Sequence, residues 1–336
     1  MKKSIIIDAG STDLKIYDII NKKIYKEKNF LAYRLEFDFS NVQVHSRNLY
    51  AYGNDAFEYF DRCPNNIEVV QCILNNKVID IEEQSLLINK VLKKYNINSG
   101  FSSSRSYILT SKLMTNFEKD AKKKSTGINS IKEINVEDIL SLSPEVKERP
   151  NSIIISIGQD NSFIITTHYN EILFVKNINF NARRLDEAVQ NYVKYKNNVS
   201  ISLHSAAKAR EELGIINIFG NSVEIPAIEI RTGLPTKFKL MDKLIQYIYK
   251  ESVRNLIDEV NLSLKRLPNE AVYNCIDGNI FFSGSLSSDS ALNKIISRRF
   301  NTNYRVLDIS EILFSDDFNN YLNGDKNGKK NKKKEK

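Results

Sequence analysis

The stretch from Ser4 to Asp18, SIIIDAGSTDLKIYD, most constrains what this chain can fold into. Ile5, Ile6 and Ile7 form a β-branched run that is typical of a strand buried on both faces. Small and hydroxylated residues at positions 8–12 interrupt the run before apolar character returns, which predicts a strand, a tight turn and a second strand. The tip of such a hairpin can direct backbone N–H groups at a phosphate, and an Asp at the end of the incoming strand can hold the water shell of Mg²⁺.

Two later segments repeat parts of this pattern. Residues 152–167, SIIISIGQDNSFIITT, again combine an apolar strand, a glycine-containing turn and an apolar strand, and residues 279–287, NIFFSGSLS, place Gly and Ser between a strand and a helix start. One such turn is weak evidence, because any β-hairpin can carry these residues. Two hairpins and a strand–glycine–helix element, with helices alternating between strands, predict a duplicated α/β fold with a ligand cleft between its halves.

Length and composition agree with two domains and exclude several other classes. The chain has 336 residues, of which 41% are hydrophobic, enough for two packed cores. It has no run of eighteen apolar residues, so we expect no transmembrane helix, and its first residues lack the apolar stretch of a cleavable signal. The 3 cysteines and 3 histidines are scattered, which predicts a reducing cytoplasm with neither a disulfide framework nor a metal cluster.

The formal net charge of +8 is concentrated at the carboxyl end. Residues 326–336, KNGKKNKKKEK, supply most of it, and the rest of the chain is nearly balanced. We therefore expect no nucleic-acid partner, and we expect residues 323–336 to form a basic disordered tail. Such a tail can contact anionic lipid, or it can serve only as a solubilising end.

The order of the segments predicts where the domains lie. We expect a first domain at residues 1–143 and a second at residues 144–322. Aromatic side chains are frequent at about residues 32–66, which indicates a small subdomain inserted in the first domain. A second small subdomain is expected at about residues 179–240.

Capping residues mark two helix starts in the first half. Asp80, with Glu83 three residues later, predicts the start of a helix that runs to about Tyr95. Thr110 or Ser111 is expected to cap a second helix, whose last turn is basic and suits the negative end of the helix dipole.

Several segments, in order, resemble the MreB family of bacterial actins, within the actin-like ATPases. IIIDAGSTDLKIY resembles the first phosphate loop of that family and IIISIGQDNSFIITTHYNEIL the second, while INVEDILSL is similar to the segment with the catalytic Glu. EIRTGLPTKFKL resembles a strand–turn–strand of the family, and NIFFSGSLSSDSALNKII its adenosine-binding element. The resemblance spans roughly residues 4–322. It implies an actin-like fold, in which two duplicated RNase H-like α/β domains flank a nucleotide cleft and carry small inserted subdomains.

The resemblance also implies ATP and Mg²⁺ as cofactors and assigns residues to them. Glu137 takes the catalytic position, with a first-turn carboxylate favoured by the helix dipole as the alternative role. Asp8 takes the Mg²⁺ position, with a turn-forming role as the alternative. The positions that match nucleotide contacts are Asp8, Gly10, Ser11, Thr12, Asp13, Gly158, Gln159, Asp160, Lys208, Arg210, Gly284 and Ser285.

The chain departs from the family pattern in both phosphate loops. Ser156 stands where the family has an Asp, and the loss of that carboxylate weakens the positioning of Mg²⁺ and water. Gln159 and Asp160 follow Gly158 in place of a glycine run, and their side chains hinder close approach of a phosphate to the backbone. Asp13 replaces an Asn and adds a negative charge beside the expected triphosphate.

Other departures affect the expected nucleoside pocket. Ala182 and Arg183 replace a Gly-Asp step, and Ala207 and Arg210 replace a Glu and a Lys. The adenosine-binding glycine run is reduced to Gly284 followed by Ser and Leu. These changes predict weakened or lost binding of ATP and Mg²⁺, which leaves ATPase activity an open question.

The favoured function is that of an MreB-like cytoskeletal protein, which forms filaments involved in cell shape or intracellular organisation and has degenerate ATP-binding loops. The alternatives are an active ATP-hydrolysing actin and a non-polymerising adaptor of other actin filaments. Expected partners are further copies of the chain, joined head to tail, and other MreB-type actins. We expect a cytoplasmic protein that contacts the membrane peripherally, through Phe101 in the loop at residues 99–104 and through the tail.

Overall fold

The computed structural model divides into two compact units, one of residues 1–142 and 309–336 and the other of residues 143–308. It describes residues 4–38, 43–60, 64–97, 105–169, 171–213, 220–267, 269–270, 272, 279–287, 289–301 and 304–331. The break after residue 142 lies beside the boundary expected from the sequence. The segment from residue 309 onward belongs to the first unit, whereas the sequence analysis assigns residues up to 322 to the second domain.

Packing explains why the end of the chain belongs to the first unit. Helix α11 (Ile309–Leu313) contacts α4 (Val136–Ser141), and the ring of Phe314 meets Tyr17 edge-on with centroids 6.4 Å apart. The last helix, α12 (Asp316–Asn331), continues into the segment that the sequence analysis expected to be a disordered tail. Residues 332–336 lie outside the described residues.

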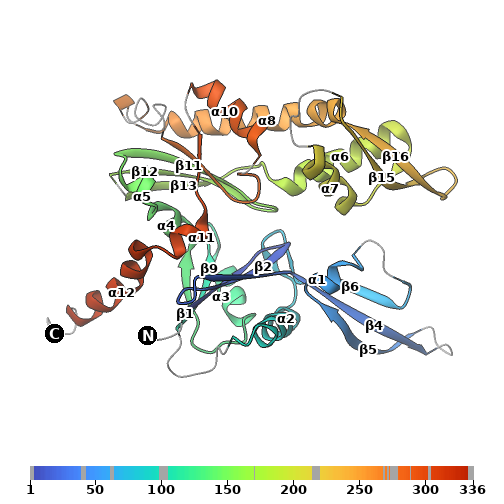
Figure 1. Cartoon of the computed structure of the whole chain (residues 1–336), viewed down its shortest axis with the longest axis horizontal. Helices are drawn as coiled ribbons and strands as arrows, with labels where there is room; N and C mark the ends of the chain where they lie inside the picture. The colour runs from blue at the N-terminus through green and yellow to red at the C-terminus, as the bar shows by residue number, and fades with distance from the viewer. Residues whose placement is uncertain are drawn as a thin grey trace. The chain divides into compact units, whose positions relative to one another are not determined.

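The first unit is built on a five-stranded sheet in the order β10-β9-β1-β2-β3 (Figure 1). Its central strand β1 runs antiparallel to β2 and parallel to β9, and Ile6 and Ile7 in this strand have no exposed surface. The hairpin predicted from the first residues is therefore confirmed. The strands are β1 (Ser4–Ala9), β2 (Asp13–Asp18), β3 (Lys23–Lys28), β9 (Arg105–Thr110) and β10 (Lys132–Asn135).

The second unit repeats this topology in the order β13-β12-β11-β17-β18. Strand β11 runs antiparallel to β12 and parallel to β17, so it holds the place that β1 holds in the first unit. The duplicated α/β architecture predicted from the sequence is confirmed by this match. The strands are β11 (Asn151–Ile157), β12 (Ser162–His168), β13 (Glu171–Asn177), β17 (Ile280–Ser283) and β18 (Tyr304–Val306).

A small sheet is inserted between β3 and β9 in the first unit. Strands β5, β4 and β6 form it, and the rings of Phe30, Phe57 and Phe60 pack together with centroids 4.9–5.7 Å apart. The inserted elements are β4 (Phe30–Asp38), β5 (Gln43–Tyr52), α1 (Asn54–Phe57), β6 (Ile67–Gln71), β7 (Ile73–Leu74), β8 (Lys77–Val78) and α2 (Ile81–Lys94).

The second unit carries its own insertion between β13 and β17. A three-stranded sheet, β14-β15-β16, lies with α6 and α7, and the long α8 returns the chain to the main sheet (Figure 1). The elements are α6 (Ala182–Asn197), β14 (Val199–Ser200), α7 (Leu203–Leu213), β15 (Ser222–Glu229), β16 (Pro235–Met241) and α8 (Asp242–Leu264), with α5 (Pro144–Lys147) before the sheet and α10 (Ser290–Phe300) after β17.

One of the two predicted helix caps is confirmed and the other is wrong. Asp80 accepts N–H bonds at the start of α2, as expected. Helix α3 (Asn116–Lys124) is capped by Thr115, which forms a capping box with Glu118. Ser111 does not cap α3 because the helix begins only at Asn116; the Ser111 hydroxyl instead donates to the Glu137 carboxylate and accepts the Leu113 N–H.

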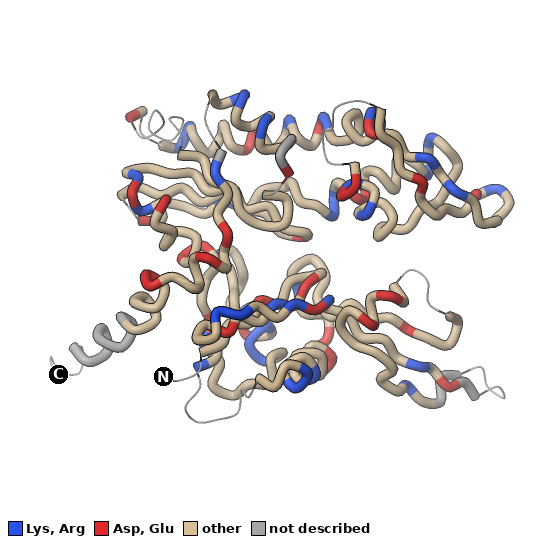
Figure 2. Tube along the Cα trace, in the orientation of Figure 1, with Lys and Arg blue, Asp and Glu red and all other residues tan. Residues whose placement is uncertain are grey.

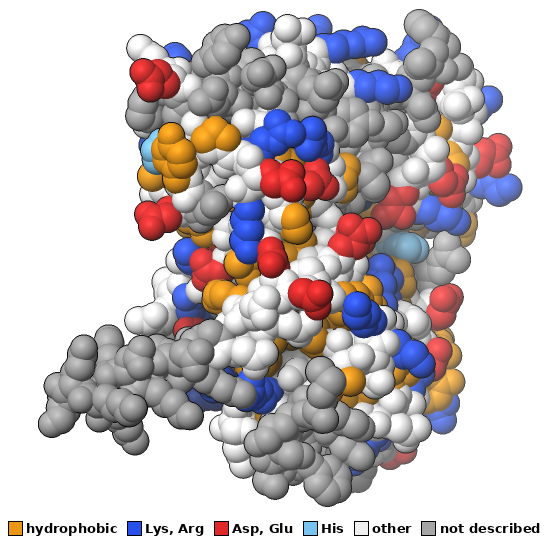
Figure 3. Space-filling view, turned by 60° about the vertical axis from the view of Figure 1, so that its left-hand side comes forward, with side chains coloured by type: hydrophobic (Ala, Val, Ile, Leu, Met, Phe, Trp, Pro, Cys, Tyr) orange, Lys and Arg blue, Asp and Glu red, His pale blue; other side chains and the backbone are white. Residues whose placement is uncertain are grey.

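Charge is mixed over the described surface, and no helix in the described part of the chain combines the length and apolarity needed to span a bilayer. Lys and Arg positions are spaced along α8 (Figure 2), and acidic and basic side chains are interspersed on the face drawn in Figure 3.

Helix α8 offers a matched test of the core of the second unit. Leu256 is fully buried in it, whereas Leu262 on the same helix is 49% exposed. Leu256→Ala should lower the free energy of unfolding by about 2–5 kcal/mol because it leaves a cavity, and Leu262→Ala by no more than about 0.5 kcal/mol. Urea denaturation followed by circular dichroism measures both, and equal losses would contradict the packing of α8.

Candidate functional site

The turn between β1 and β2, called here the first loop (Gly10–Thr12), is held by backbone and side-chain bonds. The Gly10 N–H donates to the carbonyl of Asp13 at 3.0 Å, which closes the turn. The Asn29 amide donates to the Gly10 carbonyl at 2.6 Å, and the Gln71 amide donates to the Ser11 carbonyl at 2.7 Å. Neighbouring strands therefore fix the shape of the first loop. The sequence analysis did not nominate Asn29 or Gln71.

Asp8, the predicted Mg²⁺ residue, ends β1 in a half-buried position and has a cation nearby. Lys122 of α3 is only 5% exposed. Burial lowers the pKa of the Lys122 ammonium, and the charge of Asp8 acts in the opposite direction without restoring the ordinary value. The charge of Asp8 thus acts on a buried amine of its own unit, and Lys122 was not among the residues predicted from the sequence.

The donor set allows Asp8 to contribute to a Mg²⁺ site but not to form one. Among the described residues, no group of three or more His, Cys, Asp or Glu side chains is placed to hold a metal ion. A Mg²⁺ ion at Asp8 would need water and substrate phosphate oxygens for its octahedral shell, as is usual for nucleotide-bound magnesium.

Asp13, predicted to contact nucleotide, is bound by two lysines of the neighbouring strand. Its carboxylate lies 3.0 Å from Lys28 Nζ and 3.0 Å from Lys26 Nζ, because β2 pairs with β3 in a register that aligns these positions. Burial acts to raise the pKa of Asp13, but Lys28 and then Lys26 outweigh it and hold the pKa below its ordinary value. The carboxylate is therefore compensated within the sheet.

Glu137, the predicted catalytic residue, has no exposed surface. It lies in the first turn of α4, and its carboxylate accepts the hydroxyl of Ser111 and the backbone N–H of Lys112, the latter 3.1 Å from each oxygen. In this arrangement Glu137 holds the loop after β9, a contact between residues 25 and 26 positions apart in the sequence.

The turn between β11 and β12, called here the second loop (Gly158–Asn161), is closed in the same way. The Gly158 N–H donates to the Asn161 carbonyl at 3.0 Å and to the Ser162 hydroxyl at 3.2 Å. The Asp160 carboxylate, whose side chain is 1% exposed, pairs with Arg183 of α6. The second loop is thus joined to α6 by an ion pair.

Gln159 and Arg210, both predicted to contact nucleotide, donate hydrogen bonds to the same carboxylate. Asp186 of α6 accepts from Arg210 Nε at 2.7 Å and from the Gln159 amide at 3.4 Å. Burial lowers the pKa of Arg210, but Asp186 more than offsets this and raises it above its ordinary value. Lys208, on the exposed side of α7, lies 3.8 Å from Glu212 and does not join this group. Asp186 is a further residue that the sequence analysis missed.

Gly284 and Ser285 lie directly after β17, against the end of β11. Gly284 has φ +89°, and a Cβ atom there would lie 2.3 Å from the carbonyl oxygen of Ile157. The same carbonyl accepts the Leu286 N–H at 3.2 Å and the Ser285 hydroxyl at 3.4 Å. The glycine is therefore required by the close approach of two backbones, and the second unit brings Gly158 and Gly284 to the same end of its sheet.

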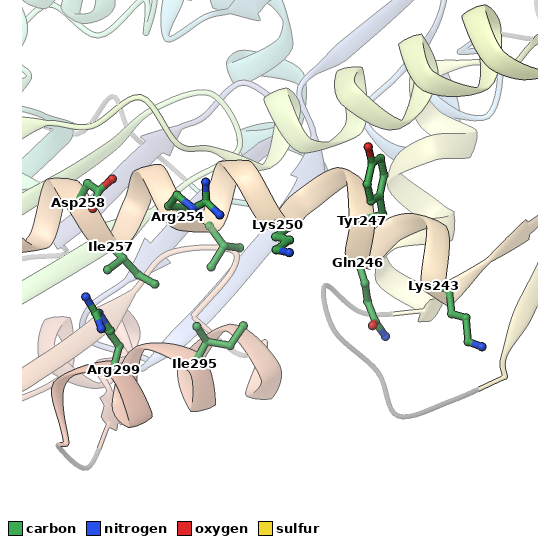
Figure 4. Close-up of a pocket in the computed structure, with 10 residues that line it drawn as sticks. Lys243, Gln246, Tyr247, Lys250, Arg254, Ile257, Asp258, Ile295 and Arg299 are labelled. Carbon is green, nitrogen blue, oxygen red and sulfur yellow. The ribbon is translucent and has the colours of Figure 1, made fainter.

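A separate groove of about 760 Å³ lies on α8 and α10, and none of its residues belongs to the predicted set. Ile295 and Arg299 of α10 point toward α8 (Figure 4). The charged side chains of the lining are four cations and one carboxylate: Lys243, Lys250, Arg254, Arg299 and Asp258. The groove therefore differs in chemistry from the glycine-containing loops at the sheet ends.

These features define an actin-like protein: two units with the same sheet topology, each with a closed hairpin turn at the end of its central strand. The family model of the MreB/Mbl protein matches residues 2–311. The chain belongs to the MreB/Mbl family.

Individual relatives are distant but cover most of the chain. The cell shape-determining protein Mbl of Bacillus cereus is 20% identical over 84% of both chains. The cell shape-determining protein MreB of Escherichia coli K12 is 22% identical over 83% of this chain and 81% of its own.

Solved structures support the fold. MreB5 of Spiroplasma citri bound to ADP superposes with a TM-score of 0.81 at 17% identity, covering 98% of this chain and 99% of its own. The MamK double helical filament gives 0.70 at 13% identity, covering 93% and 96%.

The Asp13 ion pairs predict a pH-dependent contribution to stability. Because the folded protein lowers the pKa of Asp13, its stabilisation is present above the ordinary pKa of about 4 and is lost as the pH falls through the lower folded value. Asp13→Asn should reduce the free energy of unfolding at pH 7 by about 0.5–1 kcal/mol, and the difference should shrink below pH 4. Urea denaturation at several pH values measures this, with Glu224→Gln, which breaks the exposed Glu224–Lys237 pair, as control. A difference that is independent of pH would contradict the assignment.

Gly233 and Gly284, both positive-φ glycines of the second unit, give another matched pair. Gly233 has φ +69°, and no atom lies within 4 Å of the place that a Cβ would take, so Gly233→Ala bears only the backbone cost of about 1–2 kcal/mol. Gly284→Ala adds the collision with Ile157 and should lose a further amount of about 1–3 kcal/mol. Thermal and urea unfolding of the two variants measures the difference, and similar losses would show that the two backbones do not approach closely.

Proposed function

We propose that this chain is a filament-forming bacterial actin of the MreB type, which organises cell shape or intracellular architecture and has a weakened hold on Mg²⁺ and ATP. The observation that carries the proposal is the repeated sheet with its hairpin turn in both units, in a chain of the MreB/Mbl family. The curated relatives named cell shape-determining proteins support the cellular role, and the MamK filament supports assembly.

Adenine nucleotide is the ligand class that the proposal assigns to the chain. The Spiroplasma citri MreB5 structures are bound to ADP and AMPPNP, which supports this choice. In the first loop, Gly10, Ser11 and Thr12 keep the small and hydroxylated groups that suit a phosphate. Their retention supports residual nucleotide binding at the first unit.

The polar side chains of the loops support the weakening of that binding. Asp13 is paired with lysines of β3, and Asp160 is paired with Arg183. Gln159 is bonded to Asp186. Groups that are already bonded within the protein must give up those bonds before they contact a ligand, which costs binding energy.

We also propose that the chain hydrolyses ATP slowly or not at all, because of the position of Glu137. A general base has to reach the attacking water, yet the carboxylate of Glu137 is buried and bonded to Ser111 and Lys112. We propose that its main role is to fix the loop after β9. In relatives with an active site of this kind, such a carboxylate would orient water toward the γ-phosphate.

We propose that the chain acts by associating with further copies of itself. A head-to-tail contact between identical copies is heterologous and, when it does not close into a ring, produces an open filament. Other MreB-type actins and the inner membrane surface are proposed as further partners. Phe101, proposed to touch the membrane, lies outside the described residues; one Phe supplies only about 2 kcal/mol, so a filament would bind through many copies.

Polymerisation of the purified full chain tests this proposal. We expect high-speed sedimentation and electron microscopy to reveal filaments both with and without ATP and Mg²⁺, with no more than about a twofold difference in the pelleted fraction and no sustained phosphate release. Filaments that require ATP and release phosphate would favour an active ATPase. A chain that forms no filaments but pellets with a second MreB-type actin would favour an adaptor.

A further inference from the structure

The amino end of helix α6 is already occupied by the second loop. The N–H groups of Ala182 and Arg183 donate to the carbonyls of Gly158 at 3.1 Å and Gln159 at 2.9 Å. The next N–H group of the helix donates to the side chain of its cap, Asn181, at 2.9 Å. A helix amino terminus binds anions through these first N–H groups, and here all three are bonded within the unit.

The charge at this helix end is also satisfied internally. Asp160 pairs with Arg183 in the first turn of α6, and the two side chains are 1% and 15% exposed. The Asn181 amide donates to the Asp160 carbonyl at 2.8 Å, which fixes the loop backbone beside the ion pair. An aspartate carboxylate therefore lies where the helix dipole and a guanidinium both favour negative charge.

From these contacts we propose that Asp160 acts as a built-in anion, which takes the place of a nucleotide phosphate at the second loop and keeps this loop closed without ligand. The second unit then has its assembly-competent loop conformation in the absence of nucleotide. The residues of the second loop do not fit a triphosphate in this state, because the anion would meet the Asp160 carboxylate and bonded N–H groups. This inference rests on the proposed filament function. It attributes the ability of the filaments to assemble without nucleotide to one ion pair, Asp160–Arg183.

The two partners of the pair have opposite charges, so their substitutions should behave differently. Asp160→Asn leaves Arg183 without its anion beside the end of α6, and an added phosphate can replace the lost carboxylate. Arg183→Gln leaves the Asp160 carboxylate buried without its cation, and phosphate would add repulsion. Removing one partner of a buried pair is costly because the other charge remains uncompensated.

The experiment measures the critical concentration for assembly of the full chain by sedimentation, with no additive, with inorganic phosphate, and with ATP and Mg²⁺. Wild type should change less than twofold between these conditions. Asp160→Asn should raise the critical concentration at least fivefold without additive, and phosphate or ATP should restore it to within twofold of wild type. Arg183→Gln should show a similar rise that neither additive restores.

Two further variants control for charge loss and for folding. Glu224→Gln breaks the exposed Glu224–Lys237 pair on β15 and β16 and should assemble like wild type. Arg183→Lys keeps a cation beside Asp160 and should stay within threefold of wild type without additive. Near-ultraviolet circular dichroism checks that each variant is folded; if Asp160→Asn is unfolded, the contrast between Arg183→Gln and Arg183→Lys still decides the proposal, because equal assembly of the two without additive would show that the cation beside Asp160 is not needed.

The outcomes separate this inference from the proposed function. Failure of wild type to form filaments under any condition would overturn the function itself. Wild-type filaments that need ATP, an Asp160→Asn variant that assembles normally without additive, or rescue of Arg183→Gln by phosphate would each overturn the role of Asp160 while leaving filament formation intact.

Discussion

The fold depends on a central strand in each unit that is buried on both faces. Strands β1 and β11 pair antiparallel with the next strand in the chain and parallel with a strand that comes much later. The antiparallel partner requires a tight turn at the carboxyl end of the central strand. The parallel partner ends at the same edge, so that in the second unit Gly284 follows β17 and meets the end of β11.

Charge compensation within each unit holds a carboxylate at or beside each hairpin turn. Asp13 is paired by lysines on the adjacent strand, and Asp160 is paired by Arg183 on α6. An ion pair within the protein stabilises the turn whether or not a ligand is present.

Several residues predicted to act in the site are buried, and their side chains are already bonded within the protein. Glu137 lies in the first turn of a helix, and its carboxylate is bonded to Ser111 and the Lys112 backbone. Arg210 is predicted from the sequence to contact nucleotide, yet it bonds to Asp186, which also accepts from Gln159. Lys122 is the opposite case, a residue that the sequence does not single out but the structure does. It belongs to a run of three lysines, and nothing in that run marks one of them as buried and under the influence of Asp8.

The sequence by itself determined the hairpins, the duplicated α/β order and the family, because apolar periodicity, glycine-containing turns and motif spacing are local and repeat along the chain. Only the tertiary structure decided that α3 begins at Thr115, that the last helices belong to the first unit, and that Asp160 meets Arg183 and Glu137 meets Ser111. These partners are 23 and 26 residues apart, and side-chain pairs at such separations are set by how helices pack on sheets, which no local pattern records.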